Sequence, residues 1–336
     1  MPKLRGAVIG CGMISEFHLG AWRRIPEVEI VALCDQSLER GAGRRAQFFP
    51  GARLYRDLAE LLAAEELDFI DILTPPAAHR EHCRRAQAAG LHIICQKPLG
   101  ADLQDTRALA AMTRGYPRLF AVHENHRYRP WFREILRLAG EGIFGVARFL
   151  RLEHHQPGQP AEAFKLEGEL GILLDYGIHL VDLVRALLGD PEQVYARLHR
   201  PNPRVRGESL AHIVYEYPRT TAVIDIAWKP AGLFRGGLLL EGDRGEALYE
   251  GTMIRGETSR LRVLDGEAVV LDESRSPDED YAESFYLLQR ECVDAMLGRG
   301  AVTQTLAENL KTLAATFAAY AAAQQGGAVR VADYAA

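Results

Sequence analysis

The hydrophobic pattern of the first 125 residues alternates between short apolar runs and helical spacing. The runs are rich in Val, Ile and Leu, and the segments between them carry an apolar residue at every third or fourth position. We therefore expect strands at 4–9, 28–34, 69–73, 92–95 and 118–122, with helices at 15–24, 38–49, 58–64, 79–89 and 102–114. Strands that alternate with helices predict an α/β fold with a doubly wound parallel sheet.

The pattern changes after about His126. Helices are expected at 130–138 and 170–188, and helices at 281–297 and 305–323 close the chain. Between them lie strand signals at 194–199, 212–217, 221–228, 237–241, 246–250, 261–263 and 268–271. Their spacing, with Gly and Pro at the bends, predicts a large open and mostly antiparallel sheet. We thus predict two domains, residues 1–125 and 126–336, which agrees with a chain of 336 residues at roughly 150 residues per domain.

The composition and net charge of the chain argue against some classes of partner, namely nucleic acid and membranes. Apolar residues make up 48% of the chain and charged residues 25%, the balance of an ordinary globular protein. A net charge of −5 argues against nucleic acid as a partner, and no apolar stretch reaches the roughly 18 residues of a membrane span. The five cysteines form no CxxC pair, and the N-terminus shows no secretory pattern. We expect a cytoplasmic protein without disulfides and without a bound metal.

A glycine-rich loop follows the first predicted strand. Gly10-Cys11-Gly12-Met13-Ile14-Ser15 reads G-x-G-x-x-G with Ser in the last place, and a helix follows it. This context predicts a dinucleotide site in which Gly10, Gly12, Met13 and Ile14 border the pyrophosphate at the helix N-terminus. Asp35 ends the second strand, where a carboxylate binds the ribose hydroxyls and repels a 2′-phosphate. NAD is therefore favoured over NADP, a preference that Arg40 would weaken if it reached the ribose.

Two further strands end in residues that suit a cofactor site. Thr74-Pro75-Pro76 follows the strand at 69–73, with His79 near the start of the next helix. Gln96-Lys97-Pro98 follows the strand at 92–95. In open α/β sheets, ligands bind beyond the carboxyl ends of the strands. Lys97 is one of only five lysines among 40 basic residues, so a lysine at this place suggests a titratable ammonium used in proton transfer. A rigid loop with a surface lysine is the simpler alternative.

A third group of polar residues interrupts an apolar helix. Asp175 and His179 are four residues apart and share one helical face, and Asp182 lies one turn beyond His179. A histidine between carboxylates suits an oriented acid or base, although a hydrogen-bonded core histidine with a structural aspartate explains the pattern slightly better when these residues are taken alone. Asn125 ends the last predicted strand and would border such a site. His154 and His155 are adjacent, so on a strand they would face opposite sides and not share a metal.

Taken together, these motifs resemble the glucose–fructose oxidoreductase and inositol dehydrogenase (Gfo/Idh/MocA) family along nearly the whole chain. The resemblance implies an N-terminal Rossmann domain that binds NAD and a C-terminal domain whose open sheet covers the substrate with one face and forms a homodimer or homotetramer with the other. It places the family's catalytic lysine at Lys97 and its D-x-x-x-H pair at Asp175 and His179. Gln96 stands where the family usually has Glu.

The family resemblance also implies roles. His179 would act as acid or base at the substrate hydroxyl, Lys97 would assist this proton transfer and Asp175 would orient a sugar, polyol or cyclitol. We expect Thr74, Pro75, His79, Gln96 and Lys97 to contact the cofactor, and Lys97, Asn125, Asp175 and His179 to contact the substrate. Two alternatives remain at this point: redox-neutral glycoside cleavage with retained NAD, and a non-catalytic sensor of NAD(H) or sugar.

Overall fold

The computed structural model describes residues 3–252 and 258–335. Its residues fall into two compact units, 1–125 with 282–310, and 126–281 with 311–336. The first division coincides with the predicted change of pattern. The second differs from the predicted two-domain division, because residues 282–310 belong to the first unit. The physical reason is apolar packing: in this segment Phe285, Leu288 and Cys292 are fully buried, and the Phe285 ring stacks on Phe17 at 5.3 Å.

The first unit contains a six-stranded parallel sheet in the order β3-β2-β1-β4-β5-β6. Its strands are β1 (Leu4–Ile9), β2 (Val28–Cys34), β3 (Arg53–Tyr55), β4 (Phe69–Ile72), β5 (His92–Gln96) and β6 (Phe120–His123). The intervening helices are α1 (Ser15–Trp22), α2 (Leu38–Phe48), α3 (Leu58–Ala64), α4 (Pro76–Ala88) and α5 (Leu103–Met112). The order reverses between β1 and β4, as in a doubly wound sheet. The prediction of a parallel sheet is confirmed. Among its strands, only β3, which has three residues, was not predicted.

Near-continuous burial explains why these strands are apolar on both faces. Val8, Leu33, Ile70 and Ile93 are at most 2% exposed, because helices cover both sides of a parallel sheet. One polar residue, Asp71, sits fully buried in the middle of β4. A carboxylate in such a place requires strong hydrogen-bond donors.

The second unit contains a nine-stranded sheet in the order β14-β13-β12-β11-β7-β10-β9-β8-β15. Its strands are β7 (Ala147–Pro157), β8 (Gln193–His199), β9 (Leu210–Glu216), β10 (Thr221–Lys229), β11 (Arg235–Gly242), β12 (Gly245–Glu250), β13 (Ser259–Asp265), β14 (Ala268–Arg275) and β15 (Val329–Arg330). All neighbouring strands are antiparallel except β7 and β10. The mostly antiparallel prediction is confirmed, but the central strand β7 was not predicted.

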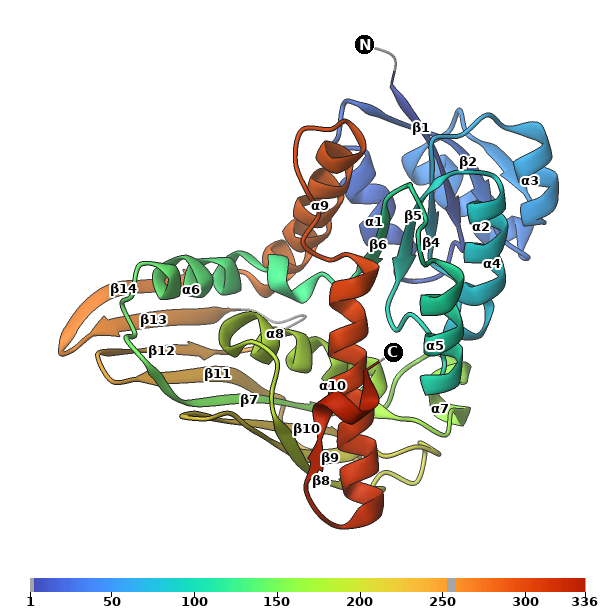
Figure 1. Cartoon of the computed structure of the whole chain (residues 1–336). Helices are drawn as coiled ribbons and strands as arrows, with labels where there is room; N and C mark the ends of the chain where they lie inside the picture. Colours follow the sequence, from blue (N-terminus) through green and yellow to red (C-terminus); the bar gives the residue numbers. More distant parts are fainter. Residues whose placement is uncertain (1–2, 253–257, 336) are drawn as a thin grey trace. The chain divides into compact units, whose positions relative to one another are not determined.

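Helices of the second unit lie over one face of this sheet. They include α6 (Pro130–Gly140), α7 (Ala163–Glu167), the π-helix η2 (Leu173–Gly177) and α8 (Ile178–Leu188), with short 3₁₀ turns η1 (His126–Tyr128) and η3 (Val331–Tyr334). Figure 1 shows α6 and α8 along the same side of the sheet. The helices α9 (Pro277–Met296) and α10 (Leu306–Gln325) each contribute residues to both units.

Burial along the strands of this sheet alternates between its two faces. On β7, Leu150, Leu152 and His154 are fully buried, whereas Arg151 and Glu153 between them are not. The register joins Leu248, Leu239, Arg151, Val223, Val214 and Tyr195 into one row across the opposite face. This row, which we call the outer row, is only partly buried and rich in apolar side chains.

Candidate active site

The glycine loop has the backbone that a pyrophosphate site needs. Gly10 has a φ of +100°, and a Cβ there would lie 2.9 Å from the backbone carbon of Leu73. Gly12 has open space where its side chain would be, with no atom within 4 Å among the described residues. Ser15 begins α1 and its Oγ donates to the Gly12 carbonyl oxygen at 2.6 Å. A side chain at position 12 would fill this cradle, so the loop fits a dinucleotide at the helix N-terminus.

Asp35 lies directly beyond β2, on the same edge of the parallel sheet. Its Oδ2 accepts the Cys11 N–H at 2.7 Å, and its Oδ1 accepts the Ser37 N–H at 2.7 Å. Arg40 also reaches Oδ1, with Nη2 at 3.0 Å. The glycine loop and the carboxylate are thus tied together, as a ribose-binding acid beside a pyrophosphate loop requires. Burial, assisted by the Asp35 charge, raises the pKa of the Cys11 thiol to about 12, so Cys11 is an inert neighbour.

His79 joins the two loops that follow β4 and β5. It is fully buried in α4, with Nε2 at 2.7 Å from the Thr74 carbonyl oxygen and Nδ1 at 3.2 Å from the Leu99 carbonyl oxygen. Burial lowers the pKa of His79 despite these backbone contacts, which keeps the ring neutral. Pro75 precedes α4 as its N-cap residue. The contacts of Thr74, Pro75 and His79 with the cofactor stay predictions, while the ring of His79 holds the loops in place.

Gln96 and Lys97 follow one another at the carboxyl end of β5. The Gln96 side chain is nearly buried, and its Oε1 accepts the backbone N–H of Lys97 at 2.7 Å. Its Nε2 lies 3.0 Å from Nε2 of His18. Both polar atoms of the Gln96 amide are therefore engaged inside the first unit. The predicted contact of Gln96 with the cofactor is untested, and the contacts of its side chain point to a supporting role behind Lys97.

The segment with Asp175 differs from the expected α-helix. Leu173–Gly177 forms a π-helix, and only Ile178–Leu188 is α-helical. Gly177 is the last residue of the π-helix. It packs closely against β10, since a Cβ there would lie 2.6 Å from Cδ1 of Ile226. π-helical turns are rare and are common at functional sites. The predicted i, i+4 relation of Asp175 and His179 therefore spans two helix types, which a sequence pattern alone does not distinguish.

Lys165, from α7, pairs with Asp175. The Lys165 Nζ lies 3.1 Å from Asp175 Oδ1 and 3.5 Å from Glu162 Oε1. Burial alone would lower the pKa of Lys165, but the charges of Asp175 and Glu162 outweigh it and raise that pKa. The sequence analysis did not single out Lys165. Only its rarity as a lysine could have drawn attention to it.

A stack of aromatic side chains lies over the inner face of the large sheet. The rings of His126 and His179 are 3.8 Å apart and nearly parallel, and Tyr176 stacks on His154 at 3.7 Å. Burial lowers the pKa of His154 to about 3, so this histidine is neutral. His154 and His155 do face opposite sides of β7, because His155 instead lies 3.1 Å from Asp225. Flat rings of this kind suit the apolar face of a sugar.

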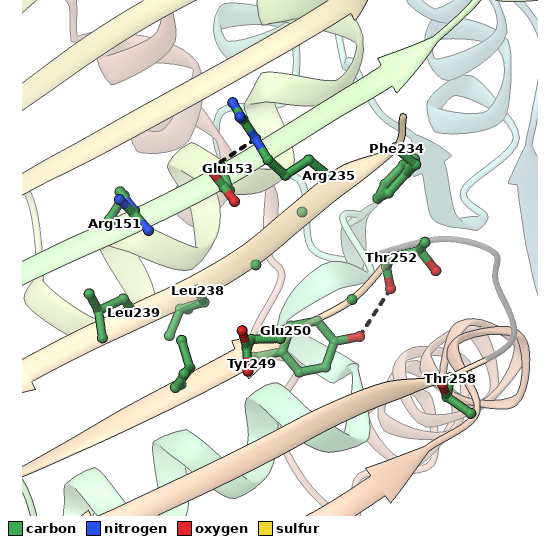
Figure 2. Close-up of a pocket in the computed structure, with 14 residues that line it drawn as sticks. Arg151, Glu153, Phe234, Arg235, Leu238, Leu239, Tyr249, Glu250, Thr252 and Thr258 are labelled. Carbon is green, nitrogen blue, oxygen red and sulfur yellow. Dashed lines mark hydrogen bonds and ion pairs between the residues drawn. The ribbon is translucent and has the colours of Figure 1, made fainter. Parts of the chain in front are cut away.

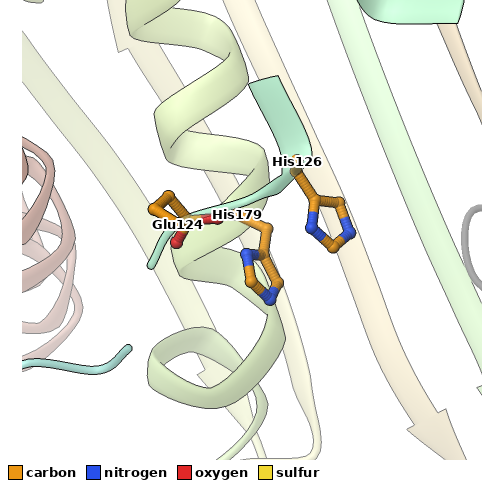
Figure 3. A group of neighbouring side chains, drawn as sticks. All are labelled: Glu124, His126 and His179. Atoms are coloured by element: carbon orange, nitrogen blue, oxygen red, sulfur yellow. The ribbon is translucent and has the colours of Figure 1, made fainter. Parts of the chain in front are cut away.

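Figure 3 draws His126 and His179 with Glu124, which precedes His126 by two residues. Imidazole and carboxylate groups are also the ligands that zinc accepts. The expected absence of a metal therefore stays a prediction.

Two polar residues near these motifs have partners within their own unit. Asp182 accepts Nε and Nη2 of Arg127 at 2.6 and 2.8 Å and the Thr312 hydroxyl at 2.8 Å. It is fully buried, and these contacts give it a structural role; its predicted place beside His179 stays a prediction. Asn125 donates its amide to the Ser284 hydroxyl at 2.7 Å in the first unit. Its predicted contact with the substrate stays a prediction.

A separate hollow of about 370 Å³ lies along β7, β11 and β12 of the large sheet. Figure 2 shows Arg151, Glu153 and Leu239 at this hollow, with Arg235 paired to Glu153. Among the described residues that line it, none belongs to the predicted site. It overlaps the outer row at Arg151, Leu239 and Leu248.

Comparison with known proteins places the chain among oxidoreductases. Residues 4–124 match a family model described as an oxidoreductase family with an NAD-binding Rossmann fold, and residues 132–247 match the Gfo/Idh/MocA C-terminal domain. A D-apiose dehydrogenase of Paraburkholderia graminis is 33% identical over 98% of this chain and 90% of its own length. One from Rhizobium rhizogenes is 29% identical over 98% of both.

A solved structure gives the same picture. An oxidoreductase from Agrobacterium radiobacter, in complex with NAD⁺, L-tartaric acid and magnesium, superposes with a TM-score of 0.85 at 28% identity. The match covers 98% of this chain and 99% of that one. The predicted α/β fold with a large, mostly antiparallel second sheet, and the NAD-binding character of the first unit, are thereby confirmed. In the described part of the chain no helix is long and apolar enough to cross a membrane.

Proposed function

Since the chain belongs to the Gfo/Idh/MocA family of NAD-dependent oxidoreductases, we propose that it oxidises a hydroxyl of an aldose and that Lys97, His179 and Asp175 carry the proton chemistry. One observation supports the cofactor half of this proposal above all. Gly10, Asp35, Thr74 and Lys97 each follow a different strand of one parallel sheet, so all four lie at its carboxyl edge. A dinucleotide binds at that edge in doubly wound folds.

The residues of this chain divide the work as follows. Bound NAD supplies the hydride acceptor for the hydroxyl carbon. As hydride leaves carbon, the hydroxyl must lose a proton, which requires a base within hydrogen-bond reach. We assign this base to His179. Lys97 would polarise the same oxygen and assist the proton transfer. Asp175, whose carboxylate lies 3.1 Å from the Lys165 ammonium, accepts a hydrogen bond from a neighbouring hydroxyl and fixes which carbon is presented.

The substrate class is the finer part of the proposal. Two relatives that align along 98% of this chain are named D-apiose dehydrogenases. A branched aldose is therefore the first compound to test. Two stacked ring pairs, His126 with His179 and Tyr176 with His154, form an aromatic floor at this site, and such a floor is compatible with the apolar face of a sugar.

The experiment is the formation of NADH, followed by absorbance, with NAD and a panel of aldoses, branched aldoses, polyols and inositols. We expect turnover with at least one aldose, and we expect the Lys97→Ala variant to bind NADH yet give no turnover with it. Protein that binds NADH but oxidises no member of the panel would contradict the assignment. Release of sugar without net NADH would indicate redox-neutral cleavage instead.

Cofactor choice follows from Asp35. Its carboxylate supports NAD, since a 2′-phosphate would meet a negative charge. Arg40 already pairs with Asp35 at 3.0 Å, which reduces that repulsion. We therefore propose a preference for NAD with measurable activity with NADP.

We further propose a cytoplasmic homodimer or homotetramer that forms through the outer row. The location rests on the cysteines, since all five are buried and free. The assembly rests on the apolar side chains Leu239, Leu248, Val223 and Val214, which share one face of an open sheet. Light scattering during gel filtration tests it, with Leu239→Arg expected to lower the molar mass to that of the monomer.

A further inference from the structure

A chain of buried hydrogen bonds leads from the middle of β4 toward Lys97. It begins at Asp71, which is fully buried. Its Oδ2 accepts two N–H groups at 2.8 Å each, from Nδ1 of His18 and from Nε1 of Trp22. Oδ1 has no partner in the part of the chain that the structure describes. A carboxylate with both donors on one oxygen is built to fix the orientation of those donors.

His18 is the second member of this chain, and its hydrogen bonds determine where its proton lies. It is fully buried in α1. Because Asp71 can only accept at Oδ2, Nδ1 of His18 carries a proton, and an amide nitrogen of Gln96 beside Nε2 needs Nε2 as its acceptor. The Gln96 amide nitrogen lies 3.0 Å from that Nε2 and donates to it. The ring packs between His123 at 4.0 Å and Phe285 at 5.2 Å, and Gln289 donates to the His18 carbonyl oxygen at 3.4 Å.

Gln96 is the last member, and its amide connects the His18 ring to the backbone of Lys97. With its amide nitrogen directed to His18, its Oε1 faces the backbone N–H of Lys97 at 2.7 Å. Every donor in the series thus meets an acceptor, from Trp22 and His18 to Lys97. A glutamate at position 96 would place a carboxylate oxygen against the lone pair of His18 Nε2. Glutamine, where the family usually has glutamate, is therefore the residue that supplies a donor to Nε2 of His18.

We propose that Asp71, His18 and Gln96 are positioning residues that hold the backbone at Lys97 so that its ammonium meets the substrate hydroxyl. The proposal rests on the role of Lys97 in the proposed function. None of the three needs to touch the substrate. Their effect is expected in kcat, because a displacement of about 1 Å at a reacting group can cost on the order of 100-fold in rate.

The first experiment is a double-mutant cycle. His18→Phe keeps a ring for the packing with Phe285 but removes both hydrogen bonds, and Gln96→Leu removes the bonds of the amide. We expect each single variant to lower kcat by about 10-fold or more, with the Kd for NADH within about threefold of the wild-type value. The double variant should be no more than about twofold slower than Gln96→Leu, since His18 acts through Gln96. His92→Phe, at the other end of β5, is the matched control.

Additive losses in the double variant would overturn the proposal, as would an unchanged kcat in His18→Phe. Thermal unfolding of each variant identifies effects that come only from a loosened fold. If His18→Phe does not fold, Asp71→Asn and Asp71→Leu decide the question. Asparagine keeps one oxygen acceptor for both N–H groups and should retain most of the activity, whereas leucine should lose about 10-fold in kcat. Equal losses in the two variants would contradict an orienting hydrogen bond.

The Lys97→Ala variant separates this proposal from the proposed function. If Lys97→Ala still turns over at the wild-type rate, the role of Lys97 is wrong, whatever the cycle gives. If Lys97→Ala is inactive while His18→Phe and Gln96→Leu match the wild type, the positioning chain alone fails.

Discussion

The two sheets of this protein present their chemistry in different ways. In the parallel sheet of the first unit, Gly10, Asp35, Thr74 and Lys97 each follow a strand directly and so lie at one edge. In the mostly antiparallel sheet of the second unit, the polar groups come from a π-helix, from α7 and from the inner face of β7. In a parallel sheet, any residue that follows a strand lies at the carboxyl edge, so its place in the structure can be predicted from its place in the sequence. An antiparallel sheet covered by helices has no such rule, and its site depends on distant partners.

The largest expected effect comes from the parallel edge. Lys97→Ala should lower kcat by about 10³-fold, since it removes a group that acts on the transferred proton. The affinity for NADH, measured by fluorescence, should stay close to that of the wild type. Lys229→Ala is the control, because Lys229 is a partly exposed lysine at the end of β10 that donates to the Leu233 carbonyl oxygen. A loss of NADH affinity equal to the loss in kcat would assign Lys97 to binding rather than catalysis.

The inner face of the large sheet can be tested through the pH dependence of stability. The pKa of His154 is about 3 in the folded protein because of burial, against 6.5 for an ordinary histidine. Between about pH 6.5 and pH 3, this histidine is protonated in the unfolded chain but neutral in the folded protein. The free energy of unfolding therefore decreases as the pH falls through this range. At pH 5 this histidine should account for about 2 kcal/mol of the loss in unfolding free energy relative to pH 7.

Urea denaturation at both pH values checks this prediction. In His154→Phe the loss between pH 7 and pH 5 should be smaller by that amount, while the exposed His199→Phe should behave like the wild type. An unchanged pH dependence in His154→Phe would show that the ring is charged or accessible in the folded protein.

The ion pair between Lys165 and Asp175 is a contact in the second unit that the sequence pattern did not predict, and substitution of Lys165 tests its importance. Lys165→Met removes the ammonium that lies 3.1 Å from Asp175, and we expect kcat/KM for the sugar to fall by about tenfold. Lys165→Arg should recover most of it, because the pair with Asp175 can form again. Steady-state kinetics at saturating NAD measures both. If methionine and arginine behave alike, the pair does not orient Asp175.

The smallest expected effect concerns cofactor choice at Asp35. Asp35→Ser removes the negative charge and leaves Arg40 free to bind a phosphate. We expect the ratio of kcat/KM for NADP to that for NAD to rise by about tenfold, roughly one charge–charge contact. Adding Arg40→Ala to this variant should reverse the gain. A ratio that does not move would show that Asp35 serves the loop through Cys11 and Ser37 and not the ribose.

Sequence reasoning succeeded where contacts are local and failed where they are distant. The glycine loop, Asp35 and Lys97 are defined by the strands next to them, so periodicity was sufficient to place them. Asp182 was assigned beside His179 because they share a helix, but its partners Arg127 and Thr312 lie 55 and 130 positions away. The π-helix at Asp175 packs Gly177 closely against Ile226, a contact with a distant strand that no local pattern encodes.

Two signals in the sequence were available but not used. An aspartate within the apolar strand Phe69–Ile72 demands a buried donor, and His18 on the buried side of α1 is one. Strand β7 was missed because its buried face carries His154 after Leu150 and Leu152, so that the alternation of apolar residues is short. Both cases concern polar residues in strands or helices whose other positions are buried.

The return of residues 282–310 to the first unit has a consequence for anyone who recombines this fold. A cut at 125/126 does not release an autonomous cofactor module, because the ring that stacks on Phe17 and the amide that donates to His18 come from Phe285 and Gln289. Chimeras with a relative must therefore exchange two segments of the chain together.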